Sequence, residues 1–211
     1  MINIIIPFHD GLHFLKDSIP SVISQTFTNW KLILGINGQR RHEFFEILSN
    51  QLTDPRIVVL NYDTIGKSET MNAMIADCKH DITCLLDADD FWRHDKLEKQ
   101  LKIIDKYDVC GSFCQYFGDL SGSPNVPGGI VTNEDFFLAN PIINSSFMVK
   151  HKNICYWDKR HEGIEDYDMW LRLNSEGKEF FNIPEILTFH RIHKNSCFNT
   201  KTYDLDEIRT K

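Results

Sequence analysis

The first half of the chain alternates short apolar runs with segments whose apolar residues recur at helical spacing. Four runs have the length of buried strands: 3–7, 32–36, 57–60 and 82–86. Four segments with apolar residues three or four positions apart follow them: 12–26, 44–52, 68–78 and 97–104. Strands that alternate with helices form a mostly parallel sheet with helices on both faces. The sequence therefore predicts an α/β fold.

The alternation stops near residue 108. Further on, the pattern predicts strands over 109–117 and 144–149, a Gly-, Ser- and Pro-rich loop over 118–129, and a helix over 165–176. We expect the polar stretch after Thr188 to be irregular. We predict one domain over 1–211 with two halves, 1–108 and 109–211, because 211 residues fit one generous domain.

Composition excludes several classes of protein. Lys and Arg total 23 and Asp and Glu total 30, which gives a formal net charge of −7. A protein that binds nucleic acid normally carries the opposite sign, so we expect no nucleic-acid partner. No window reaches the ~20 apolar residues that a membrane span needs, and no basic leader precedes an apolar stretch, so we predict neither a membrane span nor a signal peptide.

The six cysteines include no CxxC pair, which argues against a structural zinc site. Several lie inside apolar runs, where a thiol behaves as a small hydrophobic group. We therefore expect free thiols and a soluble protein in a reducing compartment, the cytoplasm.

Three carboxylates, Asp87, Asp89 and Asp90, directly follow the fourth predicted strand. Ligands of open α/β sheets bind at the carboxyl ends of the strands. Like charges this close need an offsetting cation, and Mg²⁺ and Mn²⁺ prefer oxygen ligands. An EF-hand is excluded because its sixth position, counted from Asp87, is Trp92 rather than Gly. Alternatively, Asp90 caps the helix that begins near residue 94, which would explain one acid of the three.

Six segments in a fixed order carry a resemblance to one family: IIIPFHD (4–10), SVISQT (21–26), GKSETMN (66–72), LDADD (86–90), GIEDYDMWLRL (163–173) and HRIHKNS (190–196). They are similar to the opening strand, the SVLxQT, GxSxARN, DXD and GxEDxDLWLRL segments and the closing YRIHxNS of the family 2 glycosyltransferases, which are inverting enzymes of the GT-A fold. The resemblance implies a Rossmann-like nucleotide-binding half over 1–108 and an acceptor half over 109–211. Compact members of the family serve bacterial surface polysaccharides and the capsid glycans of some large DNA viruses.

The resemblance also implies a reaction. A sugar would move from a nucleotide-diphosphate sugar, by the family's default a UDP-sugar, to a hydroxyl of a glycan acceptor, with Mn²⁺ or Mg²⁺ as cofactor. It places Asp89 on the metal and Asp87 near the metal or the ribose. His193 is a further candidate metal ligand, although a lone histidine is often structural. Asp166 corresponds to the catalytic base; the alternative is an acid that only favours the helix N-terminus.

The candidate contacts to the nucleotide-sugar are Pro7, Phe8, His9, Asn37, Lys67, Asn72, Asp87 and Ala88. Phe8 either stacks on a base or belongs to the core. The chain departs from the family at Ile36 and Asn37, where an acidic pair is usual, and at Met71, where an Arg is usual. These departures leave the base and the sugar open, and Lys67 could supply a compensating charge.

Other side chains have two interpretations each. Trp92 and Trp170 are sugar platforms or core residues, and residues 159–161 form a basic loop near the base or a solvated loop. Residues 144–146 resemble the family's acceptor-side strand.

Three other functions remain open. A nucleotidyltransferase would need a basic Gly-rich loop near the N-terminus, which residues 8–14 do not form. A metal hydrolase could use the acids of 87–90 with His190 and His193. The chain could also be a catalytically silent nucleotide- or carbohydrate-binding module. The departures from the family at 36, 37 and 71 favour this interpretation, and the presence of Asp87, Asp89 and Asp166 argues against it. The chain could also be one module of a longer protein with further domains.

Overall fold

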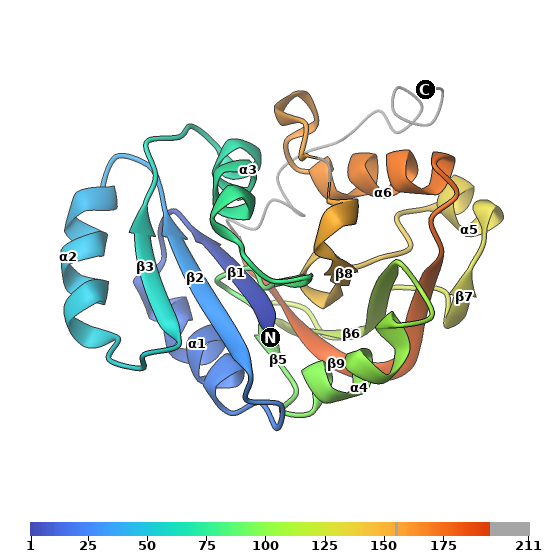
Figure 1. Ribbon diagram of the computed structural model, residues 1–211, viewed down its shortest axis with the longest axis horizontal. Coiled ribbons are helices and arrows are strands. Elements are labelled where there is room, and N and C mark those ends of the chain that lie inside the picture. The colour runs from blue at the N-terminus through green and yellow to red at the C-terminus, as the bar shows by residue number, and fades with distance from the viewer. Residues whose placement is uncertain (155, 195–211) are drawn as a thin grey trace.

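A nine-stranded sheet with helices on both faces organises the chain in the computed structural model, which describes residues 1–154 and 156–194 (Figure 1). Two of the six cysteines, Cys155 and Cys197, and the end of the 190–196 segment lie outside the described residues. The strand order is β3-β2-β1-β4-β8-β6-β9-β5, and β7 pairs with β9. The predicted α/β class with helices on both faces is confirmed.

The first half forms the parallel part of the sheet. Its elements are β1 (Ile2–Phe8), a 3₁₀ turn (Leu12–Phe14), α1 (Leu15–Ile23), β2 (Trp30–Ile36), α2 (Arg41–Gln51), β3 (Ile57–Asn61), α3 (Lys67–Asp77) and β4 (Ile82–Leu85). β1 pairs with β2 and β4, and β2 pairs with β3, all in parallel. The carboxyl ends of β1, β2 and β4 therefore meet at one edge of the sheet.

The second half adds strands of both directions. Its elements are β5 (Phe91–Trp92), α4 (Lys96–Ile104), β6 (Val109–Gly118), β7 (Gly129–Val131), α5 (Asn133–Leu138), η2 (Asn144–Ser146), β8 (Met148–Lys150), η3 (His151–Asn153), η4 (Lys159–His161), α6 (Glu165–Ser175) and β9 (Phe180–Ile192). β8 joins β4 to β6 in antiparallel pairs, and β6 pairs with β9 in parallel. One sheet thus runs through both halves.

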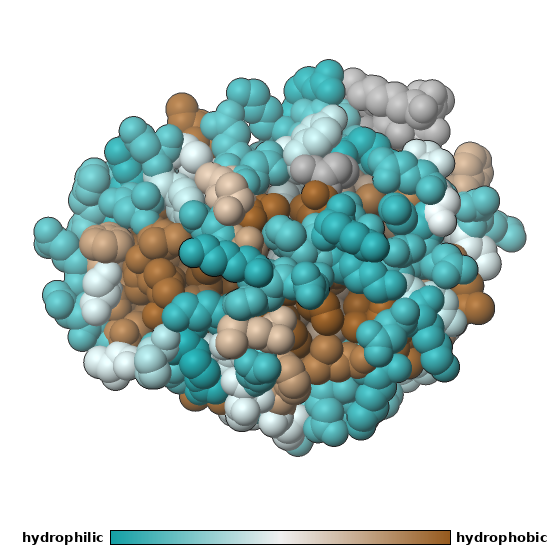
Figure 2. Space-filling model, in the orientation of Figure 1, coloured by the Kyte–Doolittle hydropathy of each residue, from teal (hydrophilic) through white to brown (hydrophobic). Residues whose placement is uncertain are grey.

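Two apolar clusters pack the helices onto the sheet. Ile4 and Ile6 of β1 face a cluster that holds the buried residues of α1, α2 and α4. Ile5 points to the opposite face, where α3 and α6 pack in a second cluster. This alternation is the period-two pattern of a strand covered on both sides. At the edge strand β3 the cover is incomplete: its last four residues are half-buried, and an apolar area lies over this strand in Figure 2.

The structure corrects several expectations. Residues 189–192, which we expected to be irregular, complete the 13-residue strand β9. Residues 144–146 form a 3₁₀ turn before β8 rather than the start of a strand. Pro20 lies inside α1. α5 was not predicted, although Thr132 and Asp135 form a capping box at its start. Among the described residues, no helix combines the length and the apolar character needed to cross a membrane.

Candidate active site

Asp87 lies at the carboxyl end of β4 and is held by three neighbours. Its Oδ1 is 2.6 Å from Nζ of Lys67. Its Oδ2 accepts hydrogen bonds from Nδ2 of Asn144 at 3.1 Å and from Oγ of Ser145 at 3.2 Å. Burial alone would raise the pKa of Asp87, but the Lys67 ammonium and these donors hold it below its usual value. Asp87 is therefore ionised, and both of its oxygens are engaged.

Asp89 faces His193, with Oδ2 2.9 Å from the ring nitrogen Nε2. Burial and the charges of Asp90 and Asp87 raise the pKa of Asp89. A divalent cation would relieve this repulsion, and a carboxylate with an imidazole is a donor set that suits Mn²⁺. The side chains present thus fit the predicted metal, with Asp89 and His193 as the more available ligands and Asp87 committed to Lys67.

Asp90 does not cap a helix, in contrast to the alternative considered for it. It is fully buried, and its carboxylate accepts from the backbone N–H of Arg191 at 2.8 Å and contacts Nδ1 of His190 at 2.9 Å. Burial would lower the pKa of His190, but the carboxylates of Asp90, Asp87 and Asp89 raise it to about 9. The residue in the N-cap position of α4 is Asp95. Asp90 therefore links the C-terminal end of β9 to residues 87–90.

Asp166 lies in the first turn of α6, next to Glu165. Its Oδ1 accepts from the N–H of Tyr167 at 2.8 Å, and its Oδ2 accepts from Nδ2 of Asn140 at 2.9 Å. Burial and the charge of Glu165 raise the pKa of Asp166 to about 7, against the lowering influence of Asn140 and Lys67. A carboxylate with this pKa is suited to take a proton near neutral pH.

Lys67 links the acids of the two halves. Its Nζ is 2.6 Å from Asp87 Oδ1 and 3.6 Å from Oε1 of Glu165, whose side chain is buried. Burial would lower the pKa of Lys67, but Asp87, Glu165 and Asp166 raise it. Lys67, which we considered as a replacement for the positive charge missing at Met71, is therefore a permanent cation. It lies between Asp87 and the first turn of α6.

Some of the predicted contacts to the nucleotide-sugar at the ends of β1 and β2 lie at the surface of the sheet edge, and others are buried. Pro7 is half-buried and His9 is exposed. Phe8 is a core residue, 1% exposed, and packs edge-to-face on Phe44 with ring centroids 5.2 Å apart, so its face is not open to a nucleotide base. Asn37 is buried, and its Nδ2 donates to the carbonyl of Gly66 at 3.2 Å.

Two predicted positions on α3 are occupied by internal contacts. Both amide atoms of Asn72 bind the backbone of Trp157: Nδ2 donates to its carbonyl and Oδ1 accepts from its N–H, each at 2.8 Å. Met71 is fully buried in the cluster between α3 and the sheet. Asn72 therefore holds the segment before α6, and the Met in place of the family's Arg is a core residue.

The two tryptophans considered as sugar platforms belong to the core. Trp92 is 3% exposed, and its indole N–H donates to the carbonyl of Ser145 at 2.7 Å. Trp170 is fully buried between Phe147 and Phe180 in edge-to-face contacts. Neither ring has a face available to a sugar.

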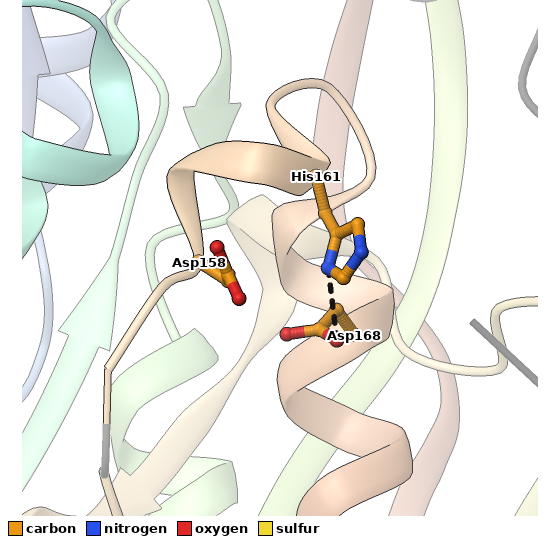
Figure 3. Close-up of side chains that lie close together, drawn as sticks. All are labelled: Asp158, His161 and Asp168. Atoms are coloured by element: carbon orange, nitrogen blue, oxygen red, sulfur yellow. Dashed lines mark ion pairs between the residues drawn. The ribbon is translucent and has the colours of Figure 1, made fainter. Parts of the chain in front are cut away.

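The basic segment 159–161 before α6 is solvated at Lys159 and Arg160, whose side chains are exposed, and ion pairs also hold it in place. Figure 3 shows Asp158 and His161 from the segment around η4 beside Asp168 of α6. Nδ1 of His161 is 3.0 Å from Asp168. Arg160 binds both oxygens of Asp158, and Arg172 pairs with Asp168 at 2.9 Å. Because guanidinium groups already engage both carboxylates, we interpret this cluster as a structural brace for α6 and not as a metal site.

Two residues of the site carry no signal in the sequence. Glu162 accepts from the N–H groups of Lys67 at 2.5 Å and Ser68 at 3.2 Å, so it occupies the N-terminus of α3. Asn140 is the hydrogen-bond donor to Asp166. Both Glu162 and Asn140 contact residues that are distant in the sequence, and neither residue type is distinctive at its position. The nearest sequence signal is Gly66, which lies beside Glu162 and has a φ of 83°.

Comparison with known proteins agrees with this arrangement. Residues 3–147 match the family model described as Glycosyl transferase family 2. The chain is 24% identical to the UDP-Glc:alpha-D-GlcNAc-diphosphoundecaprenol beta-1,3-glucosyltransferase WfaP of Escherichia coli, over 97% of this chain and 82% of that protein. It is 26% identical to the O-antigen biosynthesis glycosyltransferase WbnJ of Escherichia coli, over 100% of this chain and 90% of that protein.

Solved structures show the same fold. TarS of S. aureus in complex with UDP-GlcNAc superposes with a TM-score of 0.77 at 13% identity, over 98% of this chain and 63% of that one. The mannosyltransferase PcManGT of Pyrobaculum calidifontis, in complex with GDP-Man and Mn²⁺, gives 0.68 at 10% identity, over 92% and 58%. The chain thus spans less than two thirds of these solved chains. The GT-A-like architecture and the family match together establish that the chain belongs to the family 2 glycosyltransferases.

Proposed function

We propose that the protein is a metal-dependent, inverting glycosyltransferase that moves a sugar from a UDP-sugar to a hydroxyl of a glycan acceptor. One observation carries the proposal: Asp89 and His193 lie together at the end of the parallel strands, and Asp166 faces the same region from α6 with a pKa of about 7. Relatives support the donor class, since WfaP and WfgD are named for UDP-Glc and TarS was solved with UDP-GlcNAc.

Asp89 and His193 would hold Mn²⁺ or Mg²⁺, and Asp87 could join them if it exchanged Lys67 for the cation. When bound, such an ion supplies positive charge to the departing diphosphate. Lys67 lies beside the same acids and would add a second positive charge to the diphosphate after release from Asp87.

Asp166 would act as the general base. It removes the proton from the acceptor hydroxyl as the hydroxyl oxygen bonds to the anomeric carbon. The bond from that carbon to the diphosphate oxygen breaks on the opposite face, and UDP leaves with the bonding electrons. A single displacement of this kind inverts the anomeric configuration, and the proton remains on Asp166 until solvent takes it.

The rest of the donor would lie along the edge formed by β1, β2 and β4. Pro7, His9, Asn37 and Ala88 are the edge residues in position to contact it. Asn37 replaces an acid in the turn after β2 and is bound to Gly66, so it would present its remaining carboxamide oxygen to a donor hydroxyl or a base N–H. Phe8 and Asn72 would support this edge from inside.

Calorimetric titration with UDP tests the proposal directly. We expect UDP to bind the wild type in the presence of Mn²⁺ and to lose most of its affinity with EDTA or in Asp89→Ala. Asp105→Ala, which removes an exposed acid from the end of α4, is the matched control. Binding that is indifferent to both the metal and Asp89 would overturn the metal site.

A panel of UDP-sugars then tests the reaction. UDP release that depends on a glycan acceptor, with an inverted linkage in the product, supports transfer. Binding without turnover on any donor would indicate a silent binding module. Formation of UTP and a sugar 1-phosphate when pyrophosphate is added to a UDP-sugar would indicate a nucleotidyltransferase. We further propose that residues 1–211 act as one catalytic domain in a reducing compartment, since the cysteines at 78, 84, 110 and 114 are free and the last three are buried.

A further inference from the structure

Asn140 occupies a fixed place next to the proposed base. It lies between α5 and η2, and its Nδ2 donates to Asp166 Oδ2 at 2.9 Å. Its own Oδ1 accepts from the N–H of Ile142 at 3.3 Å. With its oxygen directed to the backbone, the amide can present only its NH₂ group to Asp166. The orientation of Asn140 is therefore set by the chain that follows it.

The loop that carries Asn140 is anchored to the core. Ile142 is fully buried, and the carbonyl of Pro141 accepts from Nδ2 of Asn182 at 2.8 Å. Asn182 belongs to β9 and is itself fully buried. A second tie runs from the Tyr167 hydroxyl, next to Asp166, to the carbonyl of Phe136 in α5. The Asn140 amide that donates to Asp166 is thus held in position before any substrate binds. A residue that positions a catalytic group needs this rigidity.

We infer that Asn140 is a positioning residue of the glycosyl transfer: it holds Asp166 Oδ2 in place and in its ionised form, so that the carboxylate can accept the proton of the acceptor hydroxyl. An ionised carboxylate only accepts hydrogen bonds, whereas a protonated one would place its own hydrogen against the NH₂ group of Asn140. The inference rests on the proposed function, because it assigns Asn140 a role only if Asp166 is the base.

Asn140 opposes the influences that raise the pKa of Asp166. Glu165 on the same helix raises the pKa of Asp166, and burial does so more strongly. Lys67 on α3 and the N–H of Tyr167 lower it together with Asn140. Because a hydrogen bond to the ionised form stabilises that form, its loss should move the pKa by about one unit in the alkaline direction.

The test compares Asn140→Ala with a matched control, Asn153→Ala. In η3, Nδ2 of Asn153 donates to Asp108 Oδ1 at 3.0 Å, so this substitution removes the same type of bond away from the site. For Asn140→Ala we expect kcat at pH 7 to fall about fivefold, because a pKa raised from about 7 by about one unit leaves about one eleventh of Asp166 ionised instead of one half. The rise of kcat with pH should move by about one pH unit in the alkaline direction, and UDP affinity should stay unchanged. At high pH much of the lost rate should return. Asn153→Ala should leave the pH profile unchanged even if it lowers the melting temperature.

A second pair of variants separates this inference from the proposed function. If Asp166→Asn has a wild-type rate, Asp166 is not the base and the proposed function fails at that residue. If Asp166→Asn is inactive but Asn140→Ala keeps the wild-type pH profile, or loses rate equally at every pH, the inference about Asn140 alone is overturned. If the inference holds, the double variant should be no slower than Asp166→Asn, because both changes act through one group.

Discussion

Neighbouring charges give two aspartates of the site opposite properties. Asp87 and Asp166 both lie near Lys67, yet the ammonium directly contacts Asp87 and lies farther from Asp166, which has Glu165 beside it. The pKa of Asp87 is therefore lowered, and that of Asp166 is raised to about 7. One carboxylate is kept as an anion beside Lys67, at the proposed donor site, and the other is able to exchange a proton near neutral pH.

Substitution of Asp166 by Asn should remove the base and leave the donor site intact. We expect kcat to fall by ~10²–10⁴-fold, the usual contribution of a general base. UDP affinity should change little, because the substitution leaves the candidate metal ligands and the strand edge in place. Rates come from acceptor-dependent UDP release and affinities from calorimetry, with Asp105→Asn as the control. A variant with close to the wild-type rate would contradict the assignment.

The raised pKa of Asp166 also predicts the pH dependence of the reaction. The base works only when ionised, so kcat/KM should fall tenfold per pH unit below about 7 and level off above it. An aspartate with an ordinary pKa near 4 would give a flat profile between pH 5.5 and 8. Initial rates across this range, with enzyme stability checked at each pH, distinguish the two profiles.

Sequence patterns predict some of these residues and not others, for a physical reason. Asp87, Asp89 and Asp90 are recognisable because three like charges after a buried strand are costly without a function. Asn140 acts through a contact across 26 positions of the chain, and Glu162 through two contacts across 94 and 95 positions. Such isolated long-range contacts leave no periodicity in the sequence.

At the scale of elements, the sequence predicts the parallel strands of the first half but not β9. β9 was missed because its inward-facing residues Asn182 and Thr188 are polar, yet both are fully buried and hydrogen-bonded. Their burial depends on β6, β7 and Pro141, which only the tertiary structure brings together. The parallel strands of the first half were predictable because each reads as a continuous apolar run, and β1, β2 and β4 are buried on both faces.

The start of α3 should loosen when Glu162 is replaced by Gln. An amide oxygen can accept from one of the two N–H groups that the carboxylate now binds, and the charge that favours the helix N-terminus is lost. We expect faster hydrogen exchange at the amides of Lys67 and Ser68 and a melting temperature lower by about 2–4 °C, for a loss of about 1 kcal/mol. The control is Glu176→Gln, which changes an exposed acid at the end of α6. Unchanged exchange at the start of α3 would show that Glu162 does not hold it.

At the scale of the whole molecule, the site joins the two halves of the sheet. The metal-binding candidates come from both halves, Asp89 after β4 and His193 after β9, and Lys67 of α3 reaches Glu165 of α6. A ligand bound among them would add a further link between segments that the sheet and these side-chain contacts already join. Donor binding should therefore stabilise the fold as a unit rather than one half of it.

Metal removal tests this coupling. A ligand at 100 times its Kd stabilises the folded state by about 2.7 kcal/mol, which for a chain of this length raises the melting temperature by about 5–10 °C. We expect UDP with Mn²⁺ to produce such a rise in the wild type, and EDTA to abolish it. His193→Ala should show a reduced rise because one metal ligand is lost, whereas Asp105→Ala should match the wild type. A UDP-dependent rise that survives EDTA would mean that Lys67 and the strand edge bind the nucleotide without a cation, and the diphosphate would then depend on this chain's own positive charge.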